Sequence, residues 1–154
     1  MSESTVKDIM TVYVTTIPVD SDVREAALLM LKGRISSLVA TQKGNPVGIV
    51  TERDIVGKVV SQDVNPSKIS VEEIMSRPII TILQEETIEQ AALVMSIYGI
   101  KRLVVVDIDG KLSGMITTTD IAAWLSTNQE FKNNASDGAK PLELKLPYQI
   151  NNKI

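Results

Sequence analysis

The sequence predicts a mixed α/β (α+β) fold built from two β-α-β-β-α repeats. The first observation is an internal repeat: between residues 6 and 43, a shift of 65 positions gives twelve identities, where unrelated sequences of ordinary composition give roughly three. The second observation is that β-branched runs and an amphipathic helical pattern follow in the same order in both halves. Each half has about 60 residues, which is marginal for independent stability, so we expect the halves to share a core.

The repeat includes polar residues as well as apolar ones. After one added residue the shift becomes 66, and Gly48-Ile-Val-Thr51-Glu-Arg-Asp54-Ile55 returns as Gly114-Met-Ile-Thr117-Thr-Thr-Asp120-Ile121. A repeat that keeps its polar positions indicates a fold unit that carries a site. We therefore expect two related pockets.

The first repeat begins with a strand and a helix. Residues 14–18 form a short β-branched run that ends at a proline, which predicts a short strand. Asp22 offers an N-cap, and residues 23–30 follow with the apolar spacing of an amphipathic helix. Gly33 suits the C-terminal cap of this helix.

Two strands and a second helix complete the first repeat. Residues 35–41 and 47–50 are predicted strands, and Lys43-Gly-Asn-Pro46 is the turn between them. Thr51 opens a helix that extends to about Val60. This order predicts a right-handed βαβ crossover followed by a hairpin.

The second repeat has the same order of elements. We predict a strand at 79–82, a helix at 87–97, strands at 102–106 and 112–116, and a helix from about 117 to 126. Asp109-Gly110 is a strong hairpin-turn signal between the last two strands.

The repeats divide the chain into three parts. We place the first repeat at residues 1–62, the second at 63–126, and a C-terminal tail outside the repeat at 127–154. Within the tail, residues 142–146 alternate apolar and charged side chains, a pattern that fits an added edge strand.

The composition excludes several classes of site. The chain has no His and no Cys, which removes Cys nucleophiles, Ser–His–Asp triads, His bases, the common zinc sites and disulfides. We predict no catalytic residue, no metal site and no enzymatic activity. The net charge is 16 − 19 = −3 without a basic cluster, which argues against a nucleic-acid partner. No signal segment or membrane span is evident, so we expect a cytoplasmic protein with no membrane partner.

In these motifs the chain resembles a tandem pair of cystathionine-β-synthase-type (CBS) domains, the arrangement called a Bateman module. The matching features are the Ile-Met lead-in to each repeat, Thr-Ile in the first strand, and Gly-φ-φ-Thr-x-x-Asp-φ in both repeats, where φ is apolar. The resemblance covers about residues 6–125. It implies that the repeats pack sheet against sheet about a pseudo-two-fold axis, that two clefts hold adenine nucleotides, and that the module forms a homodimer.

Each Thr-x-x-Asp motif has two interpretations. A helix N-terminus offers unpaired N–H groups and partial positive charge to a phosphate, and a carboxylate accepts hydrogen bonds from both ribose hydroxyls. The resemblance assigns Asp54 and Asp120 to ribose, and directs Thr51 and Thr117 towards phosphate. The same spacing is close to a capping box, in which these side chains satisfy the helix's own N–H groups. The two roles can coexist, because an arriving ligand can displace a cap.

The residues on the phosphate side differ between the repeats. Lys101 and Arg102 of the second repeat correspond to Ser36-Ser37 in the first, and Arg53 of the first motif corresponds to Thr119 in the second. The basic pair serves its own nucleotide, serves the other repeat's nucleotide from across the interface, or is a solvated strand end. The asymmetry predicts two sites of unequal affinity or phosphate number.

An adenine ring needs an apolar slot with backbone groups for its polar edge. The candidates lie at the first strand of each repeat and near the second motif: Thr16, Ile17, Thr81, Ile82, Ile100, Met115 and Ile116. Core packing is the alternative role for all of them.

These observations predict that the chain is a regulatory module that senses AMP, ADP, ATP or a related adenosyl ligand such as S-adenosylmethionine. The signal would pass to a partner protein that the sequence does not identify, and no cofactor is required. The alternative is a structural dimerisation or adaptor protein with unoccupied clefts. A stand-alone enzyme is the third hypothesis, although no acid–base pair is evident.

Overall fold

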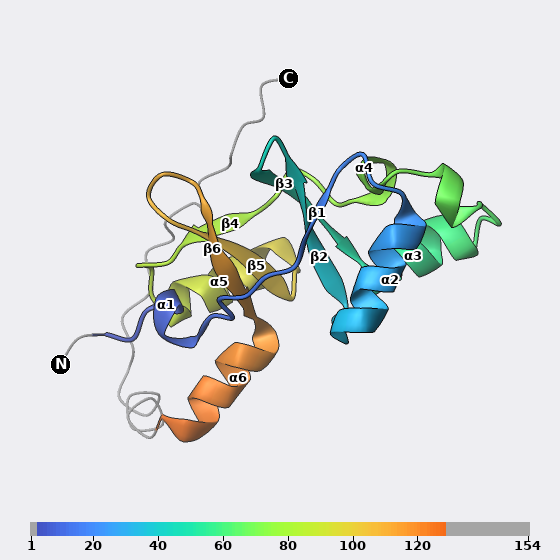
Figure 1. The fold of residues 1–154 in the computed structure, drawn as a ribbon. Helices are drawn as coiled ribbons and strands as arrows, with labels where there is room; N and C mark the ends of the chain where they lie inside the picture. Colours follow the sequence, from blue (N-terminus) through green and yellow to red (C-terminus); the bar gives the residue numbers. More distant parts are fainter. Residues whose placement is uncertain (1–2, 129–154) are drawn as a thin grey trace. The chain divides into compact units, whose positions relative to one another are not determined.

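The computed structural model describes residues 3–128 (Figure 1). These residues form two compact units, one of residues 13–79 and one that combines residues 3–12 with 80–128. Each unit contains one three-stranded sheet with its helices. The predicted fold class, a mixed α+β chain of two repeats, is confirmed.

The unit of residues 13–79 contains the strands of the first repeat, the helices that follow its lead-in, and the lead-in helix of the second repeat. Its elements are β1 (Thr16–Pro18), α2 (Val23–Gly33), β2 (Ser37–Gln42), β3 (Asn45–Thr51), α3 (Glu52–Ile55), the π-helical turn η1 (Val56–Val60), the 3₁₀ turn η2 (Pro66–Lys68) and α4 (Val71–Ile74). Strand β1 pairs parallel with β2, and β2 pairs antiparallel with β3. The predicted βαβ connection followed by a hairpin is therefore present.

Local signals explain most of these boundaries, with one correction. The carboxylate of Asp22 accepts a hydrogen bond from the Glu25 N–H at 2.8 Å and caps α2, as predicted. The prediction that Gly33 ends this helix as its cap is wrong. Gly33 is the last helical residue, and Arg34 takes the left-handed conformation that usually favours glycine, with φ 51°.

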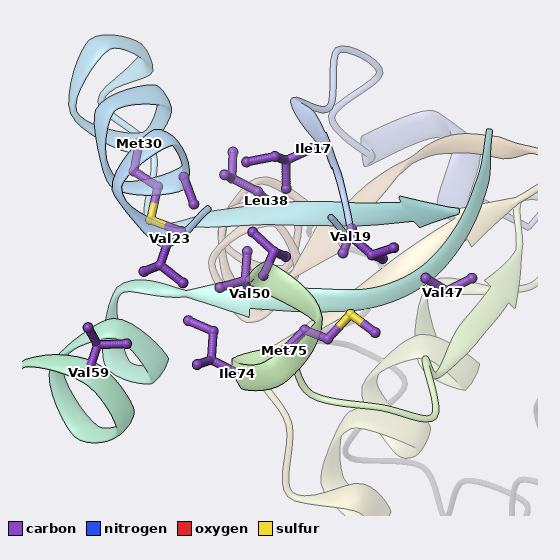
Figure 2. Packing of buried hydrophobic residues seen from close by; sticks show 13 residues of the cluster. Ile17, Val19, Val23, Met30, Leu38, Val47, Val50, Val59, Ile74 and Met75 are labelled. Carbon is purple, nitrogen blue, oxygen red and sulfur yellow. The ribbon is translucent and has the colours of Figure 1, made fainter. Parts of the chain in front are cut away.

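The core of this unit lies between the sheet and its helices (Figure 2). Ile17, Leu38 and Val50 contribute fully buried side chains from the three strands. Met30 of α2 and Ile74 of α4 pack onto the same cluster. The core contains no aromatic side chain, in keeping with the 3% aromatic content of the sequence.

The other unit repeats the plan. Its elements are α1 (Val6–Ile9), β4 (Thr81–Leu83), α5 (Ile88–Tyr98), β5 (Arg102–Val106), β6 (Leu112–Thr117) and α6 (Thr118–Thr127). Strand β4 pairs parallel with β5, and β5 pairs antiparallel with β6. Thr87 caps the start of α5 through a bond from the Gln90 N–H, and Gly99 ends it in the left-handed conformation.

The lead-in to each repeat packs in the unit that holds the strands of the other repeat. Thr11 and Met115 exchange two backbone hydrogen bonds of 2.9 Å, which fix the segment after α1 on β6. Ser76 and Ile49 make the equivalent pair, at 2.8 and 3.2 Å, after α4. The compact units and the sequence repeats therefore differ at the two lead-ins.

Two further predictions concern other parts of the chain. The edge strand expected at residues 142–146 lies outside the described residues, as does nearly all of the tail. Within residues 3–128, the structure has no helix that is both long and apolar enough to cross a membrane.

Candidate functional site

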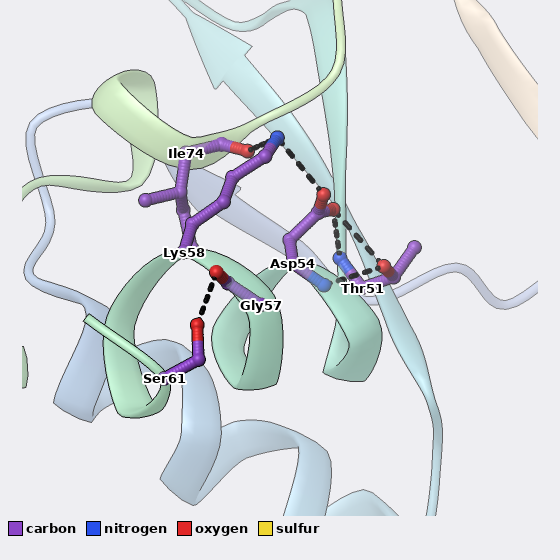
Figure 3. A network of polar contacts seen from close by, with 6 residues as sticks. All are labelled: Thr51, Asp54, Gly57, Lys58, Ser61 and Ile74. Atoms are coloured by element: carbon purple, nitrogen blue, oxygen red, sulfur yellow. Dashed lines mark hydrogen bonds and ion pairs between the residues drawn. The ribbon is translucent and has the colours of Figure 1, made fainter.

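The first Thr-x-x-Asp motif lies where β3 ends and α3 begins. The Asp54 Oδ2 atom accepts hydrogen bonds from the Thr51 N–H at 2.9 Å and from the Thr51 hydroxyl at 3.0 Å (Figure 3). In return, the Asp54 N–H donates to the Thr51 Oγ1 atom at 3.2 Å. This is a complete capping box, so the capping interpretation of the motif is correct for this structure.

The second motif has the same geometry at the junction of β6 and α6. The Asp120 Oδ2 atom accepts from the N–H and the hydroxyl of Thr117, both at 2.8 Å, and the Asp120 N–H donates to the Thr117 Oγ1 atom at 3.2 Å. Both aspartates are partly buried. The duplicated motif is therefore duplicated in space as well as in sequence.

Most of the helix N–H groups at these motifs already have partners. The Glu52 N–H donates to the Ser36 carbonyl at 3.0 Å, and the Thr118 N–H donates to the Lys101 carbonyl at 2.9 Å. Within residues 3–128, the first turns leave only the N–H groups of Arg53 and Thr119 without a hydrogen bond. Each helix start therefore leaves one N–H group for a phosphate, because the cap and the carbonyl of Ser36 or Lys101 satisfy the others.

The lead-in helices carry the same capping device. The Asp8 carboxylate accepts from the Thr5 N–H at 2.7 Å, and the Glu73 carboxylate accepts from the Ser70 N–H at 2.7 Å. These bonds from the capped backbone and hydroxyl groups lower the pKa of both carboxyl groups from their ordinary values. Cap geometry alone is thus no evidence of a ligand, and these two caps are natural controls for Asp54 and Asp120.

The two motifs differ at the second carboxylate oxygen. The Asp54 Oδ1 atom lies 3.0 Å from the ammonium nitrogen of Lys58, which also donates to the Ile74 carbonyl at 2.7 Å (Figure 3). Trp124 occupies the position of Lys58 in the second repeat. In the part of the chain that the structure describes, the Asp120 Oδ1 atom has no hydrogen bond or ion pair.

The predicted basic pair lies beside the second motif. Arg102 of β5 stands opposite Thr117 of β6, and Lys101 precedes it with an exposed side chain. Arg53 and Thr119 are exposed at the starts of α3 and α6. The structure thus brings Lys101 and Arg102 to the Thr117–Asp120 motif, and their role towards a phosphate stays a prediction.

The adenine candidates are mostly core residues. Ile17 and Ile82 belong to the two hydrophobic clusters, while Thr16 is exposed and Thr81 is buried. Ile100 is half-buried. Met115 and Ile116 are buried on β6, and Val104 of β5 lies between Thr81 and Met115 across the sheet. Core packing is observed for the buried ones, and a role in adenine binding stays a prediction.

One cavity lies in the unit that contains α5 and α6, and sequence reasoning identified only two of its lining residues. It has a volume of about 380 Å³, which is within the usual range of ligand pockets. Its lining includes Met95, Gly99, Ile100, Lys101, Thr118 and Ile121. Two of the predicted residues, Ile100 and Lys101, thus line a cavity, which no periodic signal indicated. Within residues 3–128, no group of three or more acidic side chains is placed to hold a metal ion.

The comparison with known families identifies the family of the chain. The model of the CBS domain matches the chain twice, at residues 6–61 and 71–127. The chain belongs to the CBS domain family. Each match contains one lead-in helix and one Thr-x-x-Asp motif, so the resemblance stated from the sequence is confirmed over both repeats.

The CBS pair is similar to parts of longer archaeal proteins. An uncharacterized protein of Methanopyrus kandleri is 40% identical over 108 residues, which cover 70% of this chain and 55% of that protein. The L-aspartate semialdehyde sulfurtransferase of Methanocaldococcus jannaschii is 35% identical over 118 residues, which cover 76% of this chain and 22% of the enzyme. The chain therefore spans about half or less of these relatives.

A solved CBS pair has the same fold. The CBS domain pair of protein MJ0100, in complex with 5′-methylthioadenosine and S-adenosyl-L-methionine, matches with a TM-score of 0.72 and 32% identity. The match covers 81% of this chain and 98% of that one. The chain is thus a CBS pair of the kind found in regulatory proteins.

Proposed function

We propose that this CBS pair is a regulatory module that senses an adenosyl ligand, either an adenine nucleotide or S-adenosylmethionine, and relays the signal to a partner protein. One site would centre on Thr51 and Asp54, and the other on Thr117 and Asp120. The observation that carries this proposal is the partly buried Asp120 carboxylate, whose Oδ1 atom has no partner among the described residues. A carboxylate oxygen of this kind suits a ribose hydroxyl, which donates a hydrogen bond.

The neighbours of Asp120 bear on the choice of ligand. Lys101 and Arg102 lie at the same end of the sheet and would favour an anionic ligand. The two ligands of the MJ0100 CBS pair carry no phosphate, so phosphate is not a general requirement of such pairs. The second site of this chain would therefore prefer AMP, ADP or ATP over 5′-methylthioadenosine.

A thermal-shift screen followed by calorimetry tests the proposal. Purified protein is screened with AMP, ADP, ATP, S-adenosylmethionine and 5′-methylthioadenosine. A ligand at 100 times its Kd stabilises the fold by roughly 2.7 kcal/mol, a shift of several degrees. The Asp54→Asn/Asp120→Asn double variant should lose the shift, because asparagine keeps a capping oxygen but loses the carboxylate charge.

The lead-in caps provide the matched control. The Asp8→Asn/Glu73→Gln double variant changes two capping carboxylates by the same chemistry and lies outside both Thr-x-x-Asp motifs. It should keep the ligand-induced shift. If neither the natural sequence nor this control responds to any ligand, or if both double variants respond equally, the adenosyl site is not at Asp54 and Asp120.

A structural adaptor is the second candidate, and the exposed apolar side chains favour it. Leu31 of α2 is 77% exposed, and Val56 and Val60 of η1 are 59% and 67% exposed. Exposed apolar side chains that form a contiguous patch mark surfaces that bind proteins. We propose a homodimer through these helices. Sedimentation should give a dimer for the natural sequence and a monomer for the Leu31→Glu/Val60→Glu double variant. A monomer at high concentration for both proteins would contradict the proposed homodimer.

We propose no catalytic role for the chain. Neither a His nor a Cys is present to act as base or nucleophile. The activity of the sulfurtransferase relative belongs to a protein of which this chain matches 22%. Incubation of concentrated protein with ATP should leave the nucleotide intact, and turnover in proportion to protein would contradict this.

A further inference from the structure

Lys58 connects the carboxylate of the first motif to helix α4. Its ammonium nitrogen contacts the Asp54 Oδ1 atom at 3.0 Å and donates to the Ile74 carbonyl at 2.7 Å. The Oδ2 atom of Asp54 already accepts two hydrogen bonds from Thr51, so both carboxylate oxygens are engaged. The Asp54 side chain is 12% exposed, and the Lys58 side chain is 48% exposed. We call these contacts of Lys58 with Asp54 and Ile74 the Lys58 bridge (Figure 3).

A π-helical turn surrounds Lys58. In η1 the Ser61 N–H donates to the Val56 carbonyl five residues back, at 2.9 Å. Single π-turns within helices occur frequently at functional sites. The corresponding helix of the second repeat, α6, is a regular α-helix from Thr118 to Thr127, and Trp124 at the position of Lys58 packs against the hydrophobic cluster. The bridge is therefore specific to the first repeat.

The bridge and a ribose would use the same atom. A ribose hydroxyl that donates to the Asp54 Oδ1 atom must replace the Lys58 ammonium group, because an oxygen with 12% side-chain exposure has little room for both. The energy of a partly exposed ion pair is modest, so the competition lowers affinity without abolishing binding. Displaced Lys58 would also leave the Ile74 carbonyl, which lies shortly before the boundary of this compact unit at residue 79.

We propose that Lys58 is an internal competitor for Asp54, which weakens adenosyl binding at the first site and couples its occupancy to helix α4. This inference rests on the proposed adenosyl function. It makes Lys58 a positioning residue, because it acts through Asp54 and α4. It also explains why one motif, built twice with the same cap, would yield two sites of different affinity.

The test isolates the first site with Asp120→Asn and then compares Lys58→Met with Lys58→Arg. Methionine keeps most of the stem and removes the charge, whereas arginine keeps the charge. Titrations use 5′-methylthioadenosine and AMP, so that an effect through a phosphate is separated from an effect on ribose. We expect Lys58→Met to raise the affinity for both ligands by about three- to tenfold. Lys58→Arg should remain near the parent value.

Lys68→Met is the matched control. Lys68 is an exposed lysine of the same compact unit that lacks any ion pair within residues 13–79. Its substitution should leave the affinity unchanged. Unchanged affinity in Lys58→Met, or a loss confined to AMP, would overturn the proposal, and the second of these results would make Lys58 a phosphate contact instead.

Hydrogen exchange separates coupling from simple packing. The Met75 N–H donates to the Val71 carbonyl at 2.9 Å, at the end of α4. Ligand should increase exchange of this amide in the Asp120→Asn background and should have no effect once Lys58→Met is added. An exchange rate that ignores ligand in both proteins would overturn the coupling.

The second site shows which proposal has failed. If Asp54→Asn protein still binds an adenosyl ligand while Lys58→Met has no effect, the adenosyl function stands and the Lys58 bridge does not. If no variant binds any ligand at either site, the adenosyl function fails and the competition fails with it.

Discussion

The two repeats build the same cap and surround it differently. Asp54 and Asp120 each accept two hydrogen bonds from the threonine three residues earlier, with distances that agree within about 0.2 Å. The remaining oxygen of Asp54 is paired with Lys58, whereas Trp124 replaces that lysine near Asp120. A repeated motif therefore predicts repeated geometry, while the availability of its groups depends on residues outside the motif.

The largest difference that we expect between the repeats concerns Gly48 of β3 and Gly114 of β6, which each contact the segment that follows a lead-in helix. A Cβ atom at Gly114 would lie 2.6 Å from the Thr11 carbonyl oxygen, in a backbone segment that two hydrogen bonds between Thr11 and Met115 hold on β6. At Gly48 the nearest atom is the flexible Met75 sulfur, at 2.7 Å, and the Ser76 carbonyl lies at 3.0 Å. We expect Gly114→Ala to lower the free energy of unfolding by about 2–3 kcal/mol and Gly48→Ala by about 1–2 kcal/mol.

Urea unfolding of both variants at constant pH measures this difference. Equal losses, or a larger loss for Gly48→Ala, would contradict the prediction that a methyl group is harder to accommodate at Gly114 than at Gly48.

The next difference concerns the ends of α2 and α5. Arg34 and Gly99 occupy equivalent left-handed positions, with φ values of 51° and 62°. Glycine adopts this conformation without strain and other residues do not. We expect Arg34→Gly to raise the free energy of unfolding by about 0.5–1 kcal/mol and Gly99→Ala to lower it by about 1 kcal/mol.

Thermal unfolding of the two single variants gives the signs. If Arg34→Gly destabilised the chain, this prediction would be contradicted, because the Arg34 side chain would then contribute more stability than its left-handed backbone costs. Arg34→Ala separates the two, since alanine removes the side chain and keeps the strained backbone.

The smallest expected effect compares the lead-in caps of α1 and α4 in acid. Hydrogen bonds lower the folded-state pKa of Asp8 and Glu73 below the ordinary values of 3.8 and 4.5. The unfolded chain therefore binds protons first, and the stability that these caps contribute at neutral pH is lost as the pH falls through the folded-state values. The decline due to Glu73 should begin near pH 4.5, and that due to Asp8 near pH 3.8.

Acid titrations of stability in Glu73→Gln and Asp8→Asn measure these contributions. Each variant should show a shallower decline than the natural sequence below its own threshold. A decline of the same steepness in all three proteins would mean that other carboxyl groups dominate.

Local signals in the sequence predict most of the secondary structure. Asp22 and Thr87 mark helix starts, and the apolar spacing after each gives α2 and α5 almost to the residue. The Thr-x-x-Asp motifs gave both the caps and the ends of β3 and β6. These features depend on neighbours within four residues, which the sequence displays directly.

The remaining features depend on contacts that periodicity does not reveal. The caps at Thr5–Asp8 and Ser70–Glu73 follow the same spacing, and a search for capping boxes would have found α1 and α4. The pairing of each lead-in with the other repeat is a long-range contact without a local signal. The π-turn at Val56–Val60 and the bond from Lys58 to Ile74 likewise join residues whose proximity only the folded chain determines.

Calorimetric titration of the natural sequence with the most stabilising adenosyl ligand tests whether the two Thr-x-x-Asp motifs bind ligand separately. We predict two binding events of unequal affinity per chain, with the weaker one absent in Asp54→Asn and the tighter one absent in Asp120→Asn. Two events that persist in the double variant, or the loss of the same event in both single variants, would contradict the claim that the two Thr-x-x-Asp motifs form two distinct adenosyl sites.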